Sequence, residues 1–288
     1  MSPSPSPKPS ADCPPEAQPG FGLIIVGDEI LSGKRADKHM VRVIELLAAR
    51  GLQLSWAEYV GDAPELITRT LRRAFDSGDI VFSCGGIGAT PDDHTRQCAA
   101  RALGVELALH PQARALIRER MRELALERGV PFEPERSDNV HRLNMGVFPH
   151  GARIIPNPYN KIPGFSCEGV GAGAVYFVPG FPVMAWPMVE SVLDTHYSHR
   201  FRSGVWAEQS VIVFDAMESA LTPLMVRLEA DHAGIKVFSL PSVDHPEFGR
   251  HIELGVKGRP EPVAASFEAL LLGLRELGVR LGPELVRK

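Results

Sequence analysis

Residues 79–95 read "DIVFSCGGIGATPDDHT", and this stretch indicates the fold of the region around it. Its first six residues are mostly apolar and β-prone, as expected of a strand buried on both faces. Three glycines follow, Gly85, Gly86 and Gly88, and glycine lets the backbone approach a ligand closely. Two acids then precede Thr95, where a short helix is predicted to begin. The order strand, glycine loop, helix is typical of a doubly wound α/β domain.

Strands and helices alternate on both sides of this stretch. Continuous apolar runs predict strands at residues 22–26, 54–60 and 174–178. Helices are predicted to begin near Asp37 and near Asp62, which has the spacing of a capping box with a glutamate three residues later. This alternation predicts an α/β fold with a mostly parallel sheet and right-handed crossovers.

The sequence predicts three regions. Residues 1–20 contain seven prolines and cannot bury a core, so we expect them to be disordered. Residues 21–200 carry the α/β pattern, although 130–173 are rich in Pro, Gly and Asn and show little periodicity. Residues 205–280 indicate a second, small α/β domain of βαββα type.

Composition excludes several classes of function. The formal net charge is -4, which argues against an electrostatic grip on nucleic acid or on an anionic membrane. No apolar run approaches the ~20 residues of a membrane span. The cysteines have neither CxxC nor zinc spacing, so we expect reduced thiols in a cytoplasmic protein. They are Cys13, Cys84, Cys98 and Cys167.

A second glycine-flanked loop lies in residues 24–35, "IIVGDEILSGKR". Gly27, Gly33 and the lysine after it suggest a phosphate-binding P-loop. The gap between the glycines is one residue too long, and Arg35 stands where Ser or Thr is required. The loop also contains two acids, one of them Glu29, where backbone amides would cradle a phosphate. We therefore interpret it as an acidic wall of a ligand site.

Acids follow three of the predicted strands. The acids are Asp28 and Glu29 in the first loop, Asp62 in the second, and Asp92 with Asp93 in the third. Glycine loops and the helix start at Thr95 attract phosphate, whereas carboxylates repel it. A divalent cation resolves this conflict, because Mg²⁺ is held by one or two carboxylates together with phosphate oxygens. The other interpretation is structural, with the acids as helix caps and the glycines in turns.

The stretch 85–95, "GGIGATPDDHT", resembles the GGxGPTxDDxT motif of the competence/damage-inducible protein A (CinA) family. The N-terminal region of that family belongs to the molybdopterin-binding superfamily, which includes MoaB and MogA. Further similar segments keep the family's chain order over roughly residues 21–195. They are "VGDEILSG" (26–33), "VGD" (60–62), "RLNMGVFPHGARIIPNPYNKIPGF" (142–165) and "VPGFP" (178–182).

The resemblance implies a three-layer α/β/α fold of the molybdopterin-binding (MPT-binding) type, followed by a small α/β domain. It implies binding of a phosphorylated small molecule, a pterin or a nucleotide. For CinA-like relatives it implies metal-dependent pyrophosphatase activity on ADP-ribose or FAD, which is the function we favour. The alternatives are an accessory protein that binds molybdopterin without turnover and a molybdopterin adenylyltransferase. It also implies a homo-oligomer.

The resemblance assigns roles to individual residues. Asp93, the second acid of the motif, is expected to be catalytic and to bind Mg²⁺ or another divalent cation, with Asp62 opposite it. The residues expected to contact the ligand or its phosphates are Gly27, Glu29, Gly33, Gly85, Gly86, Gly88, Thr90, Asp92, Thr95, Lys161, Gly164 and Gly180.

The sequence departs from the family pattern at several points. Ala89 replaces the proline of GGxGPT, Asp28 replaces a threonine, and Ile162 replaces the alanine of APGF. The chain also ends where the amidohydrolase domain of CinA would begin. We therefore expect nicotinamide mononucleotide deamidase activity to be absent.

Overall fold

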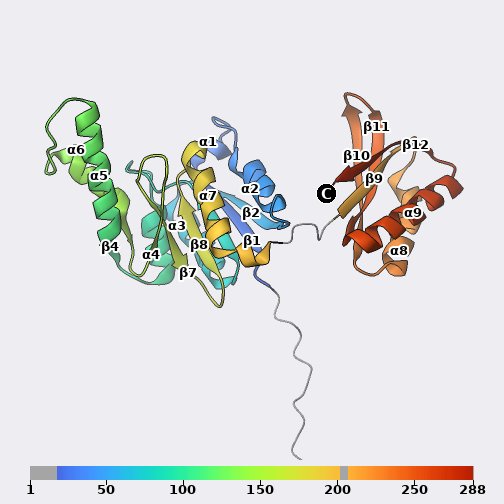
Figure 1. Cartoon of the computed structure of the whole chain (residues 1–288), viewed down its shortest axis with the longest axis horizontal. Helices are drawn as coiled ribbons and strands as arrows, with labels where there is room; N and C mark the ends of the chain where they lie inside the picture. Colours follow the sequence, from blue (N-terminus) through green and yellow to red (C-terminus); the bar gives the residue numbers. More distant parts are fainter. Residues whose placement is uncertain (1–17, 202–206, 288) are drawn as a thin grey trace, which may run out of the picture. The chain divides into compact units, whose positions relative to one another are not determined.

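A computed structural model of the chain describes residues 18–201 and 207–287. The chain divides into two compact units, one formed mainly by residues up to Tyr197 and the other mainly by those after it. Each unit is described by itself (Figure 1). Most of the predicted disordered tail, residues 1–17, lies outside the described residues. At the start of the first unit, the Gly20 N–H donates to the Asp79 carboxylate over 2.7 Å.

The main sheet of the first unit has six strands among the described residues, in the order β2-β1-β3-β8-β7-β6. The first four strands are parallel, and β7 and β6 are antiparallel to their neighbours. The predicted α/β fold with a mostly parallel sheet is therefore confirmed. The strands are β1 (Phe21–Val26), β2 (Leu54–Val60), β3 (Ile80–Cys84), β6 (Arg153–Ile155), β7 (Gly164–Glu168) and β8 (Ala174–Val178). A separate short pair consists of β4 (Leu107–Leu109) and β5 (Val147–Pro149).

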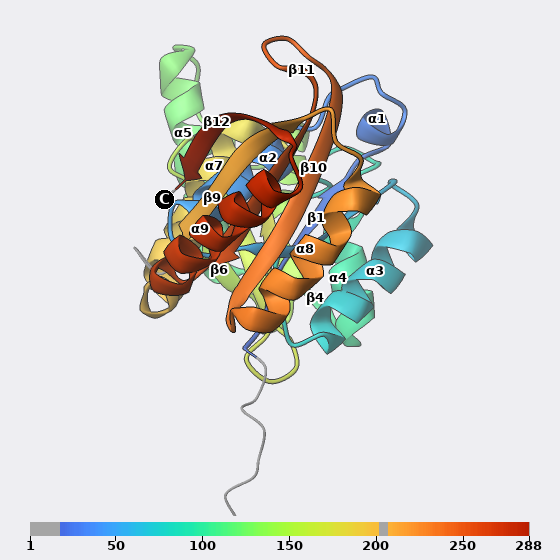
Figure 2. The same cartoon turned by 90° about the vertical axis from the view of Figure 1, so that its right-hand side faces the viewer.

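Helices cover both faces of this sheet. The helices of the first unit, within the described residues, are α1 (Asp28–Leu31), α2 (His39–Ala48), α3 (Pro64–Asp76), α4 (Thr95–Leu103), α5 (Pro111–Glu127), α6 (Ser137–Leu143) and α7 (Pro182–His196). Helices α3, α4 and α5 share a hydrophobic core with Ile24 and Val26 of β1. Because successive strand residues point to opposite faces, Leu23 and Ile25 face the other layer, which contains α2 and α7 (Figure 2). No helix within the described ranges is long and apolar enough to cross a membrane.

Local signals explain where two of these helices begin or end. The Asp37 carboxylate accepts the backbone N–H groups of His39 and Met40 at 2.8 and 3.1 Å, which starts α2 as predicted. Helix α4 begins at Thr95 and ends before Gly104, whose φ of 69° is the left-handed conformation that glycine tolerates.

The predicted capping box at Asp62 is wrong. The N-cap of α3 is Ala63, and in the described structure no side chain caps this helix start. Pro64 opens the helix instead, at a position where its missing N–H costs no hydrogen bond. Asp62 lies one residue too early, and its carboxylate has another partner, described below.

Residues 130–173 are more regular than the sequence indicated. They contain α6 and the short strands β5, β6 and β7. Runs of three to five residues are too short to display a period of two or 3.6, which is why the pattern did not reveal them. Strand β6 becomes a strand through its pairing with β7, in which Ile154 lies opposite Phe165.

The second unit is an antiparallel sheet with two helices. In the described residues its strand order is β10-β11-β9-β12. Helices α8 and α9 share one hydrophobic core with the sheet. The elements are β9 (Ala207–Phe214), α8 (Glu218–Asp231), β10 (Ile235–His245), β11 (Gly249–Gly258), α9 (Pro260–Glu276) and β12 (Arg280–Arg287). Strand β12 lies beyond the predicted βαββα pattern; it contains Gly282 and Pro283, and its register shifts there.

Candidate functional site

The carboxyl ends of β1, β2, β3 and β8 lie along one edge of the parallel sheet. Backbone hydrogen bonds join the loops that leave them: the Gly27 N–H donates to the Val60 carbonyl, and the Gly85 N–H donates to the Val178 carbonyl, each over 3.0 Å. The sheet therefore brings together the acid-bearing loops after β1, β2 and β3, in the crevice where doubly wound folds bind ligands.

The glycine loop after β3 requires its glycines. Gly85 has a φ of 106°, and a Cβ atom there would lie 2.4 Å from the Val26 carbonyl oxygen. A Cβ atom at Gly86 would lie 2.1 Å from the hydroxyl of Thr95. Thr95 is fully buried, and its hydroxyl donates to the Gly85 carbonyl. The side chain of Thr95 thus holds the loop in place.

We expect Gly85→Ala to lower the free energy of unfolding by about 2 kcal/mol or more, from strained backbone plus the collision with Val26. The matched control is Gly151→Ala. Gly151 has a φ of 85°, and no described atom lies within 4 Å of a Cβ built there. Its cost should be only the conformational part, about 1 kcal/mol. Urea denaturation measures both; equal losses would show that the approach of Gly85 to β1 is unimportant.

Asp28 and Asp62 form two reciprocal hydrogen bonds, each from the backbone N–H of one residue to the carboxylate of the other. The Asp28 N–H donates to Asp62 Oδ2 over 2.9 Å, and the Asp62 N–H donates to Asp28 Oδ1 over 3.1 Å. This reciprocal pair joins the loops after β1 and β2. Each carboxylate keeps one oxygen outside the pair, so the arrangement places acceptors of two loops side by side.

Negative charge accumulates around Asp62. Burial raises the pKa of its carboxyl above the usual value, and the negative charges of Asp28, Glu29 and Asp92 raise it further. The N–H of Asp28 acts in the opposite direction. Acids from all three loops therefore influence one carboxylate, as expected of a site that binds a cation.

Asp93 is held by its own loop. Its Oδ2 accepts the N–H of Thr90 over 2.8 Å and the Thr90 hydroxyl over 2.5 Å. The guanidinium of Arg96 lies behind the loop, only 4% exposed, and donates to the carbonyl of Ile87. Burial lowers the pKa of Arg96, and the charge of Asp93 opposes that shift. Asp93 thus also compensates a buried cation.

The helix-cap interpretation of the third loop is also wrong. The N-cap of α4 is His94, and no side chain within the described part of the chain caps this helix. Neither Asp92 nor Asp93 is therefore the N-cap of α4. Asp92 is exposed, so packing in the core does not explain it either.

The remaining predicted ligand contacts fall in different places. Gly27 is buried next to the Glu29 carboxylate, whereas Gly33 is exposed on the far side of α1. Gly164 lies inside the sheet, where a Cβ atom would be 2.3 Å from the Phe177 carbonyl oxygen, so packing explains this glycine. Gly180 borders Gly85: a Cβ atom built there would lie 3.5 Å from the Gly85 Cα atom.

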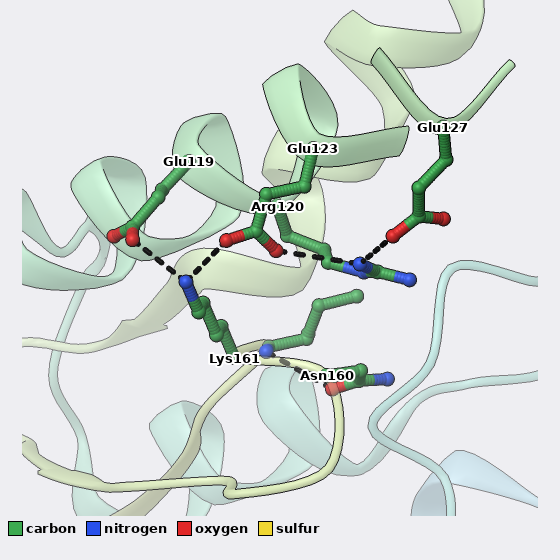
Figure 3. Close-up of polar contacts among 7 residues, drawn as sticks. Glu119, Arg120, Glu123, Glu127, Asn160 and Lys161 are labelled. Carbon is green, nitrogen blue, oxygen red and sulfur yellow. Dashed lines mark hydrogen bonds and ion pairs between the residues drawn. The ribbon is translucent and has the colours of Figure 1, made fainter. Parts of the chain in front are cut away.

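Lys161 points toward α5. Its Nζ forms ion pairs with Glu119, at 2.7 Å, and with Glu123 (Figure 3). Glu123 also pairs with Arg120 on the same helix. The charge of Lys161 is therefore compensated within the chain, and its phosphate-binding role stays a prediction from the sequence.

The sequence indicated Asp28 as an acid of the first loop, but its pairing with Asp62 depends on the register of β1 and β2. Two other residues near the site did not stand out in the sequence. Arg96 had no signal, because only burial distinguishes it from other arginines. The same holds for His39, 6% exposed, whose Nε2 lies 3.0 Å from the Gly180 carbonyl oxygen.

Comparison with known proteins agrees with this geometry. Residues 22–199 match the family described as "Probable molybdopterin binding domain". The chain belongs to that family. The predicted resemblance to the molybdopterin-binding superfamily is thereby confirmed.

The matches cover different fractions of the relatives' own chains. Protein Ta0487 of Thermoplasma acidophilum is 30% identical over 277 residues, covering 92% of this chain and 98% of that protein. A CinA-like protein of Citrifermentans bemidjiense is 30% identical over 205 residues, but the match spans only 46% of that protein. The crystal structure of the protein CinA from Thermoplasma acidophilum superimposes with a TM-score of 0.51 and 28% identity, covering 61% of this chain and 96% of that one.

Proposed function

We propose that the strand-edge loops bind the phosphates of a nucleotide diphosphate and hydrolyse its phosphoanhydride bond with the help of a divalent cation. The observation that carries this proposal is the cluster of charge around Asp62, to which acids of all three loops contribute. The glycine loop and the start of α4 lie at the same sheet edge. A phosphate and several carboxylates can share such a place when a cation lies between them.

The donor set fits a hard cation together with a phosphorylated ligand. Carboxylate oxygens are the ligands that Mg²⁺ prefers. Across residues 18–201 and 207–287, no three His, Cys, Asp or Glu side chains are grouped closely enough to hold a metal ion by themselves. Asp93 and Asp62 would therefore hold the ion only in part, with phosphate oxygens completing the set. The ion would supply neutralisation of the charge that develops on the phosphates.

The side chains of the chain would orient the reaction. The contacts from Thr90 fix Asp93, so its carboxylate needs little reorganisation when ligand binds. Since Asp62 is proposed as a ligand of the ion, the attacking water would lose one proton to the surrounding solvent. The water oxygen forms a bond to phosphorus, the bridging P–O bond breaks, and the released phosphate oxygen is the leaving group.

We infer ADP-ribose or FAD as the substrate class from the resemblance to CinA-like proteins. The family match itself supports a pterin-type ligand, which the accessory interpretation requires. Hydrolysis of ADP-ribose gives AMP and ribose 5-phosphate, and hydrolysis of FAD gives AMP and FMN. AMP is therefore a common product that distinguishes turnover from binding.

The test is to incubate the full chain with ADP-ribose or FAD, in Mg²⁺ or in EDTA, and to quantify AMP by chromatography. We expect AMP only with the metal. Binding of molybdopterin without AMP formation would refute the hydrolase and support the accessory role. Transfer of an adenylyl group from ATP to molybdopterin would instead support the adenylyltransferase.

A further inference from the structure

Arg96, the second residue of α4, places a buried cation behind the glycine loop. It is 4% exposed, and its guanidinium donates a hydrogen bond to the Ile87 carbonyl. The same loop carries Asp93, whose carboxylate lies against Gly88: a Cβ atom built at Gly88 would be 2.5 Å from Asp93 Oδ2. Arg96 and Asp93 also line one cavity of about 280 Å³. The buried cation and the proposed metal ligand therefore belong to one short turn of the chain.

The charges of Arg96 and Asp93 depend on each other. A guanidinium that is buried loses its hydration, so a protein keeps one inside only where negative charge compensates it. Burial lowers the pKa of Arg96, and the Asp93 carboxylate opposes that shift. Water and salt screen an exposed charge, whereas they screen a buried one far less. Arg96 should therefore influence any charged group that binds at Asp93.

A metal ion and a phosphate respond to this buried charge in opposite ways. A divalent cation at Asp93 is repelled by Arg96, and it draws on the carboxylate that compensates Arg96. A phosphate at the glycine loop is attracted by the same guanidinium. Within the described residues, the carboxylates are too widely spaced to complete the coordination of an ion by themselves. Both effects make the binding of the ion depend on the phosphate.

We propose that Arg96 prevents the candidate site from holding Mg²⁺ on its own, so that the ion is retained only together with the phosphates of the ligand. The inference rests on the proposed function for the place of the ion at Asp93. It adds an order of binding: phosphate, alone or already in complex with Mg²⁺, enters a site that free Mg²⁺ has not filled. Arg96 acts through Asp93, so it is a positioning residue and not a catalytic one.

The test is calorimetry on the full chain with three probes: Mg²⁺ alone, pyrophosphate in EDTA, and pyrophosphate with Mg²⁺. Arg96→Gln removes the charge but keeps a side-chain N–H that can reach toward Ile87. This variant should bind Mg²⁺ alone about tenfold more tightly than wild type, and metal-free pyrophosphate about tenfold more weakly. Damage to the fold would weaken the binding of both probes. The opposite directions therefore identify an effect of charge.

Arg101→Gln is the matched control, because Arg101 is an exposed arginine in the last turn of the same helix. It should change either affinity by less than about twofold. Arg96→Lys keeps the charge with a different donor geometry and should bind Mg²⁺ alone as weakly as wild type. Arg96→Met is the second neutral variant, used in place of Arg96→Gln if melting curves show that the latter is unfolded.

A folded neutral variant with unchanged or weaker Mg²⁺ binding would overturn the inference. So would wild-type protein that binds Mg²⁺ equally well with and without pyrophosphate. Failure of wild-type protein to bind pyrophosphate even with Mg²⁺ would overturn both the inference and the proposed metal site. If the expected binding pattern is found but ADP-ribose and FAD give no AMP, the hydrolase proposal alone fails.

Discussion

Asp93→Asn is expected to reduce phosphoanhydride hydrolysis by about two orders of magnitude or more, because it removes a fixed charge from the proposed metal site. Asparagine can still accept the Thr90 N–H and hydroxyl through its amide oxygen, so the loop itself should be kept. The measurement is AMP formation from ADP-ribose across a Mg²⁺ titration, with a melting curve for each variant. The Mg²⁺ requirement should rise in the variant.

Two further variants separate charge from loop geometry. Thr90→Val removes the hydroxyl that donates to Asp93 but keeps the carboxylate, so its rate should fall less than about tenfold. Asp92→Asn removes the neighbouring, exposed acid and should also matter less. Near-wild-type rates for Asp93→Asn and Asp92→Asn alike would refute the catalytic assignment.

The melting curve is needed because the negative charge of Asp93 also stabilises the buried guanidinium of Arg96, so the substitution can affect folding as well as the rate. Arg96 is 4% exposed, and loss of the Asp93 charge removes part of its compensation. We expect a modest drop in melting temperature with the native state still fully populated at 25 °C. A rate loss that only follows the unfolded fraction would assign Asp93 a structural role.

The sequence predicted most of the first unit because its signals are local. A continuous apolar run such as 22–26 has few alternatives to a buried strand, and α4 is followed by Gly104, at which the backbone turns left-handed. Strand β6 has only three residues and exists because β7 pairs with it. Strand β12 contains a proline, which argues against a strand unless it lies at a sheet edge.

The sequence predicted which loops meet at the candidate site, but not which residues each side chain contacts there. Parallel strands must end at the same sheet edge, so the meeting of the three acidic loops followed from the strand order. The partner of a given side chain depends on register and on packing between distant segments. Lys161 pairs with Glu119, 42 residues away, and Nε2 of His39 contacts the carbonyl oxygen of Gly180. Neither contact has a periodicity that a sequence could display.

Phe165→Ala is expected to lower the free energy of unfolding of the first unit by about 3–5 kcal/mol. The ring of Phe165 is fully buried between two others, with centroids 4.6 Å from Phe148 and 4.3 Å from Phe177. It joins the hydrophobic core below α3, α4 and α5 to strand β7. Removing the ring leaves a cavity that its neighbours fill only in part, which adds to the lost transfer free energy.

Urea denaturation of the full chain tests this, and we expect a separate transition for each of the two compact units. We expect only the transition of the first unit to move. Phe165→Leu is the matched control and should cost clearly less, since it keeps most of the apolar volume. Phe181→Ala, at a residue 58% exposed, should change stability by no more than about 0.5 kcal/mol. If Phe165→Ala cost no more than Phe181→Ala, the three-ring stack would not be part of the core, and the antiparallel half of the sheet would contribute little to the stability of the site.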